Sequence, residues 1–146
     1  MTISLGDLSI RYSNLLLQTS QAIGIDTQAY CIQFQLSATK LNQPDGRLSI
    51  PKFMRLGQTL IADHHCPELG LLCAQIAQPS LLSWVGFLAE CAPSLHQALT
   101  DMVRYETLSS RNARGHSRFY SEGPLAVAEF YSISPYNDFN HFIVDL

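Results

Sequence analysis

The sequence predicts an α+β fold that is mostly helical, with about six helices followed by a β-hairpin belonging to a small antiparallel sheet. Apolar residues recur at three- and four-residue steps over most of residues 9–109, which is the repeat of one helix face. Beyond residue 114 they alternate instead, which is the repeat of a strand. The length of 146 residues fits a single domain with its own core.

The composition and net charge of the chain exclude several classes of protein. Apolar residues make up 47% of the chain and charged residues 14%, which excludes a disordered chain or a coiled coil. A net charge of −3 argues against direct binding to a nucleic-acid backbone, because such binding needs many cations on one face. Met1–Ile10 holds no lysine, arginine or long apolar run, so we expect no secretory signal and a cytoplasmic location. In that reducing compartment the four cysteines are expected to be buried thiols.

The first clear helix is predicted over Ser9–Ile23, where the apolar residues share one face. Asp26 is placed to cap a short second helix that runs to about Leu36. Ser37–Ser49 is predicted as a loop, and Pro44-Asp45-Gly46 within it is a turn signal.

A third helix is predicted after Ser49, with Pro51 in its first turn, where a missing amide proton costs little. Its buried face is expected to hold four apolar side chains: Phe53, Leu56, Leu60 and Ile61. Three further helices are expected at about Glu68–Ile76, Ser80–Cys91 and Ser94–Ser109. The last begins with the spacing of a capping box, in which Gln97 follows Ser94 by three residues.

One apolar stretch has the length of a membrane span. Leu69–Ala92 contains a single charged residue, Glu90. Gln78-Pro79-Ser80 lies near its middle, however, and reads as a helix stop followed by a new cap. We therefore expect two buried helices here and no membrane segment.

The C-terminal region predicts a hairpin and an unfinished helix. Arg114–Ser121 and Leu125–Ile133 are two extended runs around a Glu-Gly-Pro turn. A final helix, capped by Asp138 or Asn140, begins an apolar stripe that reaches the last residue. A lone hairpin also has too few strands to shield itself. We therefore expect this chain to be a fragment of a longer protein.

No catalytic constellation is found in the sequence. There is no G-x-S-x-G elbow and no glycine-rich phosphate loop. His64-His65-Cys66, with Cys73 seven residues later, resembles half of a zinc site, but such sites usually supply two close ligand pairs. The prediction is a protein that is not an enzyme and that carries neither metal nor cofactor.

A ligand pocket is predicted where the helix Ser94–Ser109 meets the hairpin. Its walls would be aromatic, formed by Trp84, Phe87 and Tyr105, and Arg118 would hold an anionic group at its mouth. Arg118 belongs to a cluster that also contains Arg104, Arg111, Arg114 and His116. The alternatives are an ordinary aromatic core and a solvated, positively charged strand edge.

Five passages, in order, resemble the N-terminal sensing region of a helix-rich, "arabinose-binding-like" branch of AraC-type transcriptional regulators. Pro67–Leu71 is similar to the family's D-P-x-L-G-L, Leu81–Leu88 to G-x-L-G-x-x-L, and Cys91–Leu99 to S-x-T-L-x-x-A-L. The other two are Gly24-Ile25-Asp26 at a helix end and Leu48-Ser49-Ile50-Pro51 at a helix start. Pro79-Ser80 and the long polar loop Ala38–Arg47 depart from the family pattern.

The resemblance implies that residues 1–146 form an N-terminal effector-sensing domain. This domain would bind a small metabolite and control a C-terminal domain that is absent from this chain and whose two helix-turn-helix units bind DNA. The resemblance is also compatible with a homodimer. The main alternative is an interaction module that dimerises without a ligand. A second is a haem or gas sensor with His96 or His141 as axial ligand.

Overall fold

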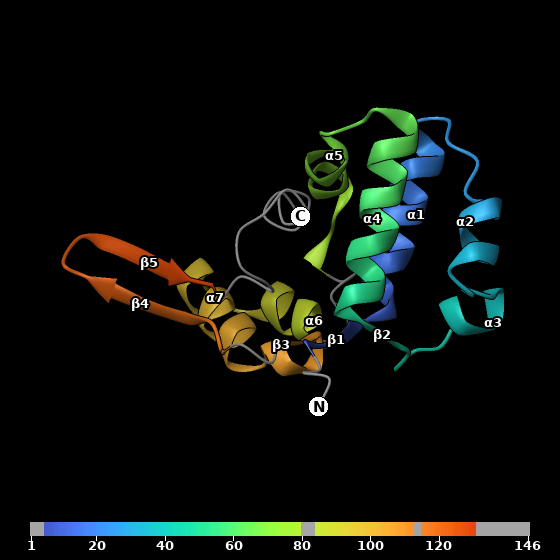
Figure 1. The fold of residues 1–146 in the computed structure, drawn as a ribbon. Coiled ribbons are helices and arrows are strands. Elements are labelled where there is room, and N and C mark those ends of the chain that lie inside the picture. Colours follow the sequence, from blue (N-terminus) through green and yellow to red (C-terminus); the bar gives the residue numbers. More distant parts are fainter. Residues whose placement is uncertain (1–4, 80–83, 113–114, 131–146) are drawn as a thin grey trace.

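A computed structural model describes residues 5–79, 84–112 and 115–130 of the chain. Its helices are α1 (Ile10–Ala22), α2 (Gln28–Gln33), α3 (Ala38–Leu41), α4 (Ile50–His64), α5 (Leu69–Ile76), α6 (Trp84–Cys91) and α7 (Leu95–Arg104), with a 3-10 turn, η2 (Glu106–Leu108). Its strands are β1 (Gly6–Ser9), β2 (Arg47–Ser49), β3 (Ser110–Asn112), β4 (Arg118–Glu122) and β5 (Leu125–Glu129). The mostly helical α+β fold that the sequence predicts is confirmed. Figure 1 shows α1 and α4 side by side, with α2 and α3 flanking α1 on one side and the β4–β5 hairpin projecting from the far end.

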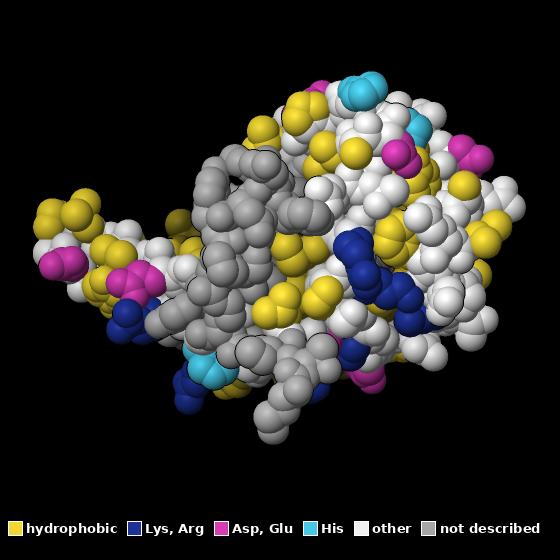
Figure 2. Space-filling model, viewed as in Figure 1, with side chains coloured by type: hydrophobic (Ala, Val, Ile, Leu, Met, Phe, Trp, Pro, Cys, Tyr) yellow, Lys and Arg dark blue, Asp and Glu magenta, His cyan; other side chains and the backbone are white. Residues whose placement is uncertain are grey.

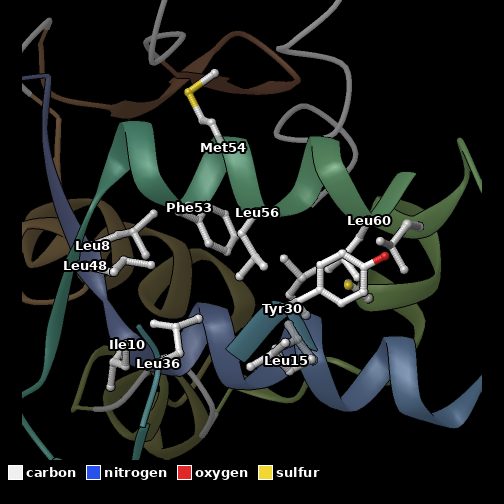
Figure 3. Close-up of a cluster of buried hydrophobic side chains, with 14 of the residues drawn as sticks. Leu8, Ile10, Leu15, Tyr30, Leu36, Leu48, Phe53, Met54, Leu56 and Leu60 are labelled. Atoms are coloured by element: carbon white, nitrogen blue, oxygen red, sulfur yellow. The ribbon is translucent and has the colours of Figure 1, made fainter. Parts of the chain in front are cut away.

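The apolar face of α4 forms the centre of the core. Phe53, Leu56 and Leu60 are fully buried, as predicted, whereas Ile61 is only half-buried. Figure 3 shows these side chains between α4 and α1, beside Tyr30 of α2. The helix starts after Ser49 with proline in its first turn, and it ends where His65 adopts a left-handed conformation.

A three-stranded antiparallel sheet, which the sequence analysis did not predict, joins distant parts of the chain. Its strand order is β2-β1-β3, so β1 lies between strands from near residue 48 and near residue 111. The strands have three or four residues each, which is too short for an alternating pattern to be recognised. The prediction of a loop over Ser37–Ser49 was wrong in part. This segment contains α3, which is capped by the Ser37 hydroxyl, and β2.

Gly46 and Arg47 fasten this sheet to its surroundings. The carbonyl of Gly46 accepts a hydrogen bond of 2.8 Å from the amide of Ile10, and a Cβ at Gly46 would lie 2.9 Å from Ile10 Cγ2. Arg47 Nε donates to Asp7 Oδ1 at 2.6 Å, and its Nη1 donates to the carbonyl of Leu108 at 2.9 Å. A single arginine therefore connects β2 to β1 and to η2.

The C-terminal elements differ from the prediction in extent. The helix predicted over Ser94–Ser109 ends at Arg104, because η2 and β3 follow it. The hairpin forms with Arg118 opposite Glu129 and Glu122 opposite Leu125, and it is a two-stranded sheet of its own. The predicted helix from Asp138 or Asn140 lies outside the described residues, as does the predicted helix start at Ser80.

The apolar stretch Leu69–Ala92 contains two separate helices, α5 and α6, as predicted. The prediction that both are buried was wrong in part, because Leu71 of α5 and Trp84 and Phe87 of α6 are more than half exposed. Among the described residues, no helix has the length and apolar character needed to cross a membrane.

A polar contact ties the short helix α2 to the end of α4. The Tyr30 hydroxyl donates to Asp63 Oδ2 at 2.9 Å and lies 2.9 Å from His64 Nε2. Tyr30 is the one buried residue of α2. Burial, and then the Asp63 carboxylate, raise the pKa of Tyr30, so its hydroxyl keeps its proton and remains the donor to Asp63.

We predict that Phe53→Ala lowers the free energy of unfolding by about 3–5 kcal/mol, because the ring is fully buried and its loss leaves a cavity. Urea denaturation followed by circular dichroism measures the effect. The control is Phe130→Ala, whose side chain is 73% exposed, with an expected change within about 0.5 kcal/mol. Equal losses in the two variants would contradict the core described here.

We predict that Tyr30→Phe costs about 0.5–1.5 kcal/mol, the usual net contribution of a hydrogen bond in a folded protein. Tyr105→Phe is the matched control, since no hydrogen bond joins that hydroxyl to the described part of the chain. Thermal unfolding of both variants tests the contact. A Tyr30→Phe protein as stable as the wild type would show that this contact does not hold α2.

Candidate functional site

Two open cavities lie on either side of the end of α2. The first, of about 780 Å³, lies between α1, α2 and α3 and is lined by Gln21, Asp26, Thr27, Gln28, Cys31, Ile32, Gln35, Leu36, Ser37, Ala38 and Leu41. The second, of about 610 Å³, lies between the end of α2 and α4 and is lined by Gln33, Phe34, Gln35, Lys52, Arg55, Gln58 and Thr59. Gln35 borders both, so a ligand in either cavity would touch the same turn.

The turn after α2 creates this arrangement. Gln35 has a positive φ of 49°, which reverses the chain, and the amide of Leu36 then donates to the carbonyl of Cys31 at 2.8 Å. Leu36 is buried in the core and fixes the turn to it. α3 follows at once and closes the far side of the first cavity.

The polar groups of the first cavity are largely satisfied by one another. Asp26 Oδ1 accepts from the amide of Gln28 at 2.9 Å, and Gln21 Nε2 donates to Thr27 Oγ1 at 2.7 Å. Burial, and then the Asp26 carboxylate, raise the pKa of Cys31, so that thiol stays protonated and unreactive at neutral pH. This cavity offers a small-molecule ligand an apolar floor and a few polar groups at its rim.

The second cavity, which we call the α2–α4 groove, is basic. Lys52 and Arg55 lie one turn apart on α4, and the side-chain amides of Gln33, Gln35 and Gln58 surround them. Burial first, and then the positive charges of Lys40 and Arg55, lower the pKa of Lys52. This arrangement can accept groups that are anionic or rich in hydroxyls.

The four residues predicted as the ligand site lie elsewhere in the structure, and none of them lines either cavity. Trp84 and Phe87 are neighbours on α6, with ring centroids 6.3 Å apart, and are 67% and 51% exposed. Tyr105 ends α7 beneath the Arg104 guanidinium, 5.6 Å from its ring centre. Arg118 is paired with Glu129 at 2.6 Å, so an anion held there would compete with that carboxylate. The assignment of these four residues to a ligand site stays a prediction.

The junction where the pocket was predicted is occupied by a ring contact. His96 of α7 and Phe119 of β4 lie 5.2 Å apart between centroids. Nearby, Glu106 Oε1 accepts from the amide of Ser117 at 2.9 Å and lies 3.3 Å from His116 Nδ1, so this part of the basic cluster has an acidic partner. Arg114 and His141 lie outside the described residues.

Two of the zinc-like residues, His64 and Cys73, have other surroundings in the structure. His64 contacts Tyr30, whereas Cys73 is buried in α5, where burial raises the pKa of its thiol. In residues 5–79, 84–112 and 115–130, no three His, Cys, Asp or Glu side chains are grouped as metal ligands.

Sequence reasoning missed the α2–α4 groove because its residues come from the end of the predicted second helix and from the polar face of a core helix. A usable signal was present. Lys40 and Lys52 are the only two lysines of the chain, and residues 27–62 hold four basic residues against one acidic residue, in a chain of net charge −3. That local excess of positive charge is visible without a structure.

Comparison with known families gives a match over residues 24–146 to the family described as the arabinose-binding domain of AraC transcription regulators, N-terminal. Comparison with curated proteins gives no match. The family match begins just before α2 and includes the whole of the α2–α4 groove. It confirms the resemblance drawn from the five sequence passages. The chain belongs to the family of N-terminal arabinose-binding domains of AraC transcription regulators.

Proposed function

We propose that this chain senses a small metabolite in the cytoplasm and thereby controls DNA binding by a C-terminal domain. The observation that supports this most directly is the family match, which covers most of the chain. The proposed role is binding rather than catalysis. DNA would be contacted through the C-terminal domain alone, in keeping with the net negative charge of these residues.

The cavities around α2 are the best-supported place for the effector. Their volumes, about 780 and 610 Å³, lie within the range typical of small-molecule sites, which is about 300–1,000 Å³. Both include the turn at Gln35, at the junction of α2 and α3.

The same region contains an element suited to shift when a ligand binds. α2 has six residues, it buries a single side chain, Tyr30, and its Ile32 is 72% exposed. Elements with so little buried apolar surface open at low free-energy cost. A ligand that binds one position of α2 better than another would shift the population between them, and this is how binding would be transmitted.

Trp84, Phe87, Tyr105 and Arg118 remain a second proposed site. Their exposure also favours the alternative function, a module that pairs two copies of this chain, because large exposed apolar side chains mark interaction surfaces. That module would form a homodimer without any effector. Sedimentation of the chain, compared with a Trp84→Ser variant, tests the pairing, since loss of the ring would shift the equilibrium toward monomer.

We predict that a thermal-unfolding screen over sugars including arabinose, organic acids, amino acids, fatty acids and aromatic acids finds at least one stabilising compound. A ligand at 100 times its dissociation constant adds about 2.7 kcal/mol to the stability of the folded state. A screen in which no compound raises the midpoint would contradict sensing and favour the ligand-free module.

Trp84 is the single tryptophan and reports which site is used. For a stabilising compound we predict unchanged affinity in Trp84→Phe and weaker affinity in Gln35→Ala, because Gln35 borders both α2 cavities. Titration calorimetry measures both variants. Weaker affinity in Trp84→Phe and unchanged affinity in Gln35→Ala, together with a change in tryptophan emission on binding, would place the effector at the aromatic residues instead.

A further inference from the structure

Three basic side chains meet on one face of the molecule. Lys52 and Arg55 come from α4, and Lys40 comes from α3, close enough for its charge to act on Lys52. Figure 2 shows lysine and arginine side chains gathered in a dark blue run over the surface where α4 and α3 lie in Figure 1. Lys40 and Lys52 are half-buried and Arg55 is exposed.

These cations have no acidic partner in the described part of the chain. The ion pairs found there are Asp7 with Arg47, Glu106 with His116, and Glu129 with Arg118. Asp45 is the one acidic residue between Asp26 and Asp63, and it forms no ion pair with these three cations in that part of the chain. Three positive charges without an acidic partner therefore repel one another, and surrounding water and salt screen part of this repulsion.

The surroundings favour a compact polar ligand. Three glutamine amides, from Gln33, Gln35 and Gln58, line the α2–α4 groove and can both donate and accept hydrogen bonds. The Thr59 hydroxyl is already used, since it donates to the carbonyl of Arg55 at 2.8 Å. Three cations are also few for duplex DNA, whose binding proteins often contact about 6–10 phosphates.

We propose that the α2–α4 groove binds a small organic oxyanion with two or more negative charges, a polycarboxylate or a phosphate monoester, held by Lys52 and Arg55 with Lys40 at its edge. This inference rests on the proposed sensing function and names the chemical class of its effector. Arginine pairs with carboxylate or phosphate oxygens through two parallel hydrogen bonds, and lysine adds a point charge. Binding neutralises the mutual repulsion of the cations and bridges α4 to the turn that follows α2.

The test is titration calorimetry of the chain with citrate and with glucose 6-phosphate, and with arabinose and glucose as neutral probes. We expect one of the two anions to bind and the neutral sugars not to bind. Citrate and glucose 6-phosphate separate the carboxylate source from the phosphate source. Added salt should weaken binding, because the contact is ionic and partly exposed.

The diagnostic variant is Lys52→Met combined with Arg55→Gln, which removes two charges and keeps the aliphatic stem of Lys52. Its affinity for the anion should fall at least about tenfold, equivalent to about 1.4 kcal/mol. The matched control is Arg104→Gln with Arg111→Gln, which removes two exposed cations elsewhere and should leave the affinity unchanged. Without ligand, the groove variant should melt at or above the wild-type temperature, because its charges no longer repel one another.

The outcomes separate this inference from the sensing function. If neither anion binds, or if both double variants lose affinity equally, the anion groove is overturned. If a neutral compound from the screen stabilises the wild type and the groove variant equally, the anion groove fails while sensing stands. If no compound of any class binds, both are contradicted.

Discussion

The packing of α4 against α1 determines which side chains reach the surface beside α2. Burial of Phe53, Leu56 and Leu60 against α1 leaves α4 only one orientation, since each of these side chains contributes about 1.5–3 kcal/mol by leaving water. With those residues facing inward, Lys52 and Arg55 necessarily face the groove beside α2. The packing of the core therefore determines where these basic residues lie.

The two flanks of this helix differ in how firmly they are held. On one side, β1 pairs with β2 and β3, and Arg47 adds hydrogen bonds to Asp7 and Leu108, so the three-stranded sheet is fixed at several points. On the other, α2 is held by buried Tyr30, by the turn at Leu36 and by the partly buried side chains of Cys31 and Phe34. A weakly held helix beside an open groove is the arrangement in which ligand contacts can outweigh the existing ones.

The sequence correctly predicted those elements that can be recognised from residues close together in the chain. The α1 and α4 helices were placed to within about a residue, because helical periodicity and the Ser49-Ile50-Pro51 start of α4 are read directly from the chain. The sheet was missed because its three strands are too short to show an alternating pattern and form only when distant segments of the chain pair. The candidate groove was missed for the same reason, since Lys40 and Lys52 become neighbours only after the turn at Pro44–Gly46. The aromatic residues around Trp84 were prominent in the sequence, yet the structure leaves them exposed.

Hydrogen–deuterium exchange of the protein, measured with and without a compound that stabilises it, locates the bound compound without assuming a site. We expect slower exchange in residues 28–42 and 50–60, the segments that border the α2–α4 groove and its neighbouring cavity. Slower exchange confined to residues 84–105 or 118–130 would contradict this expectation and would place the ligand against the exposed aromatic side chains.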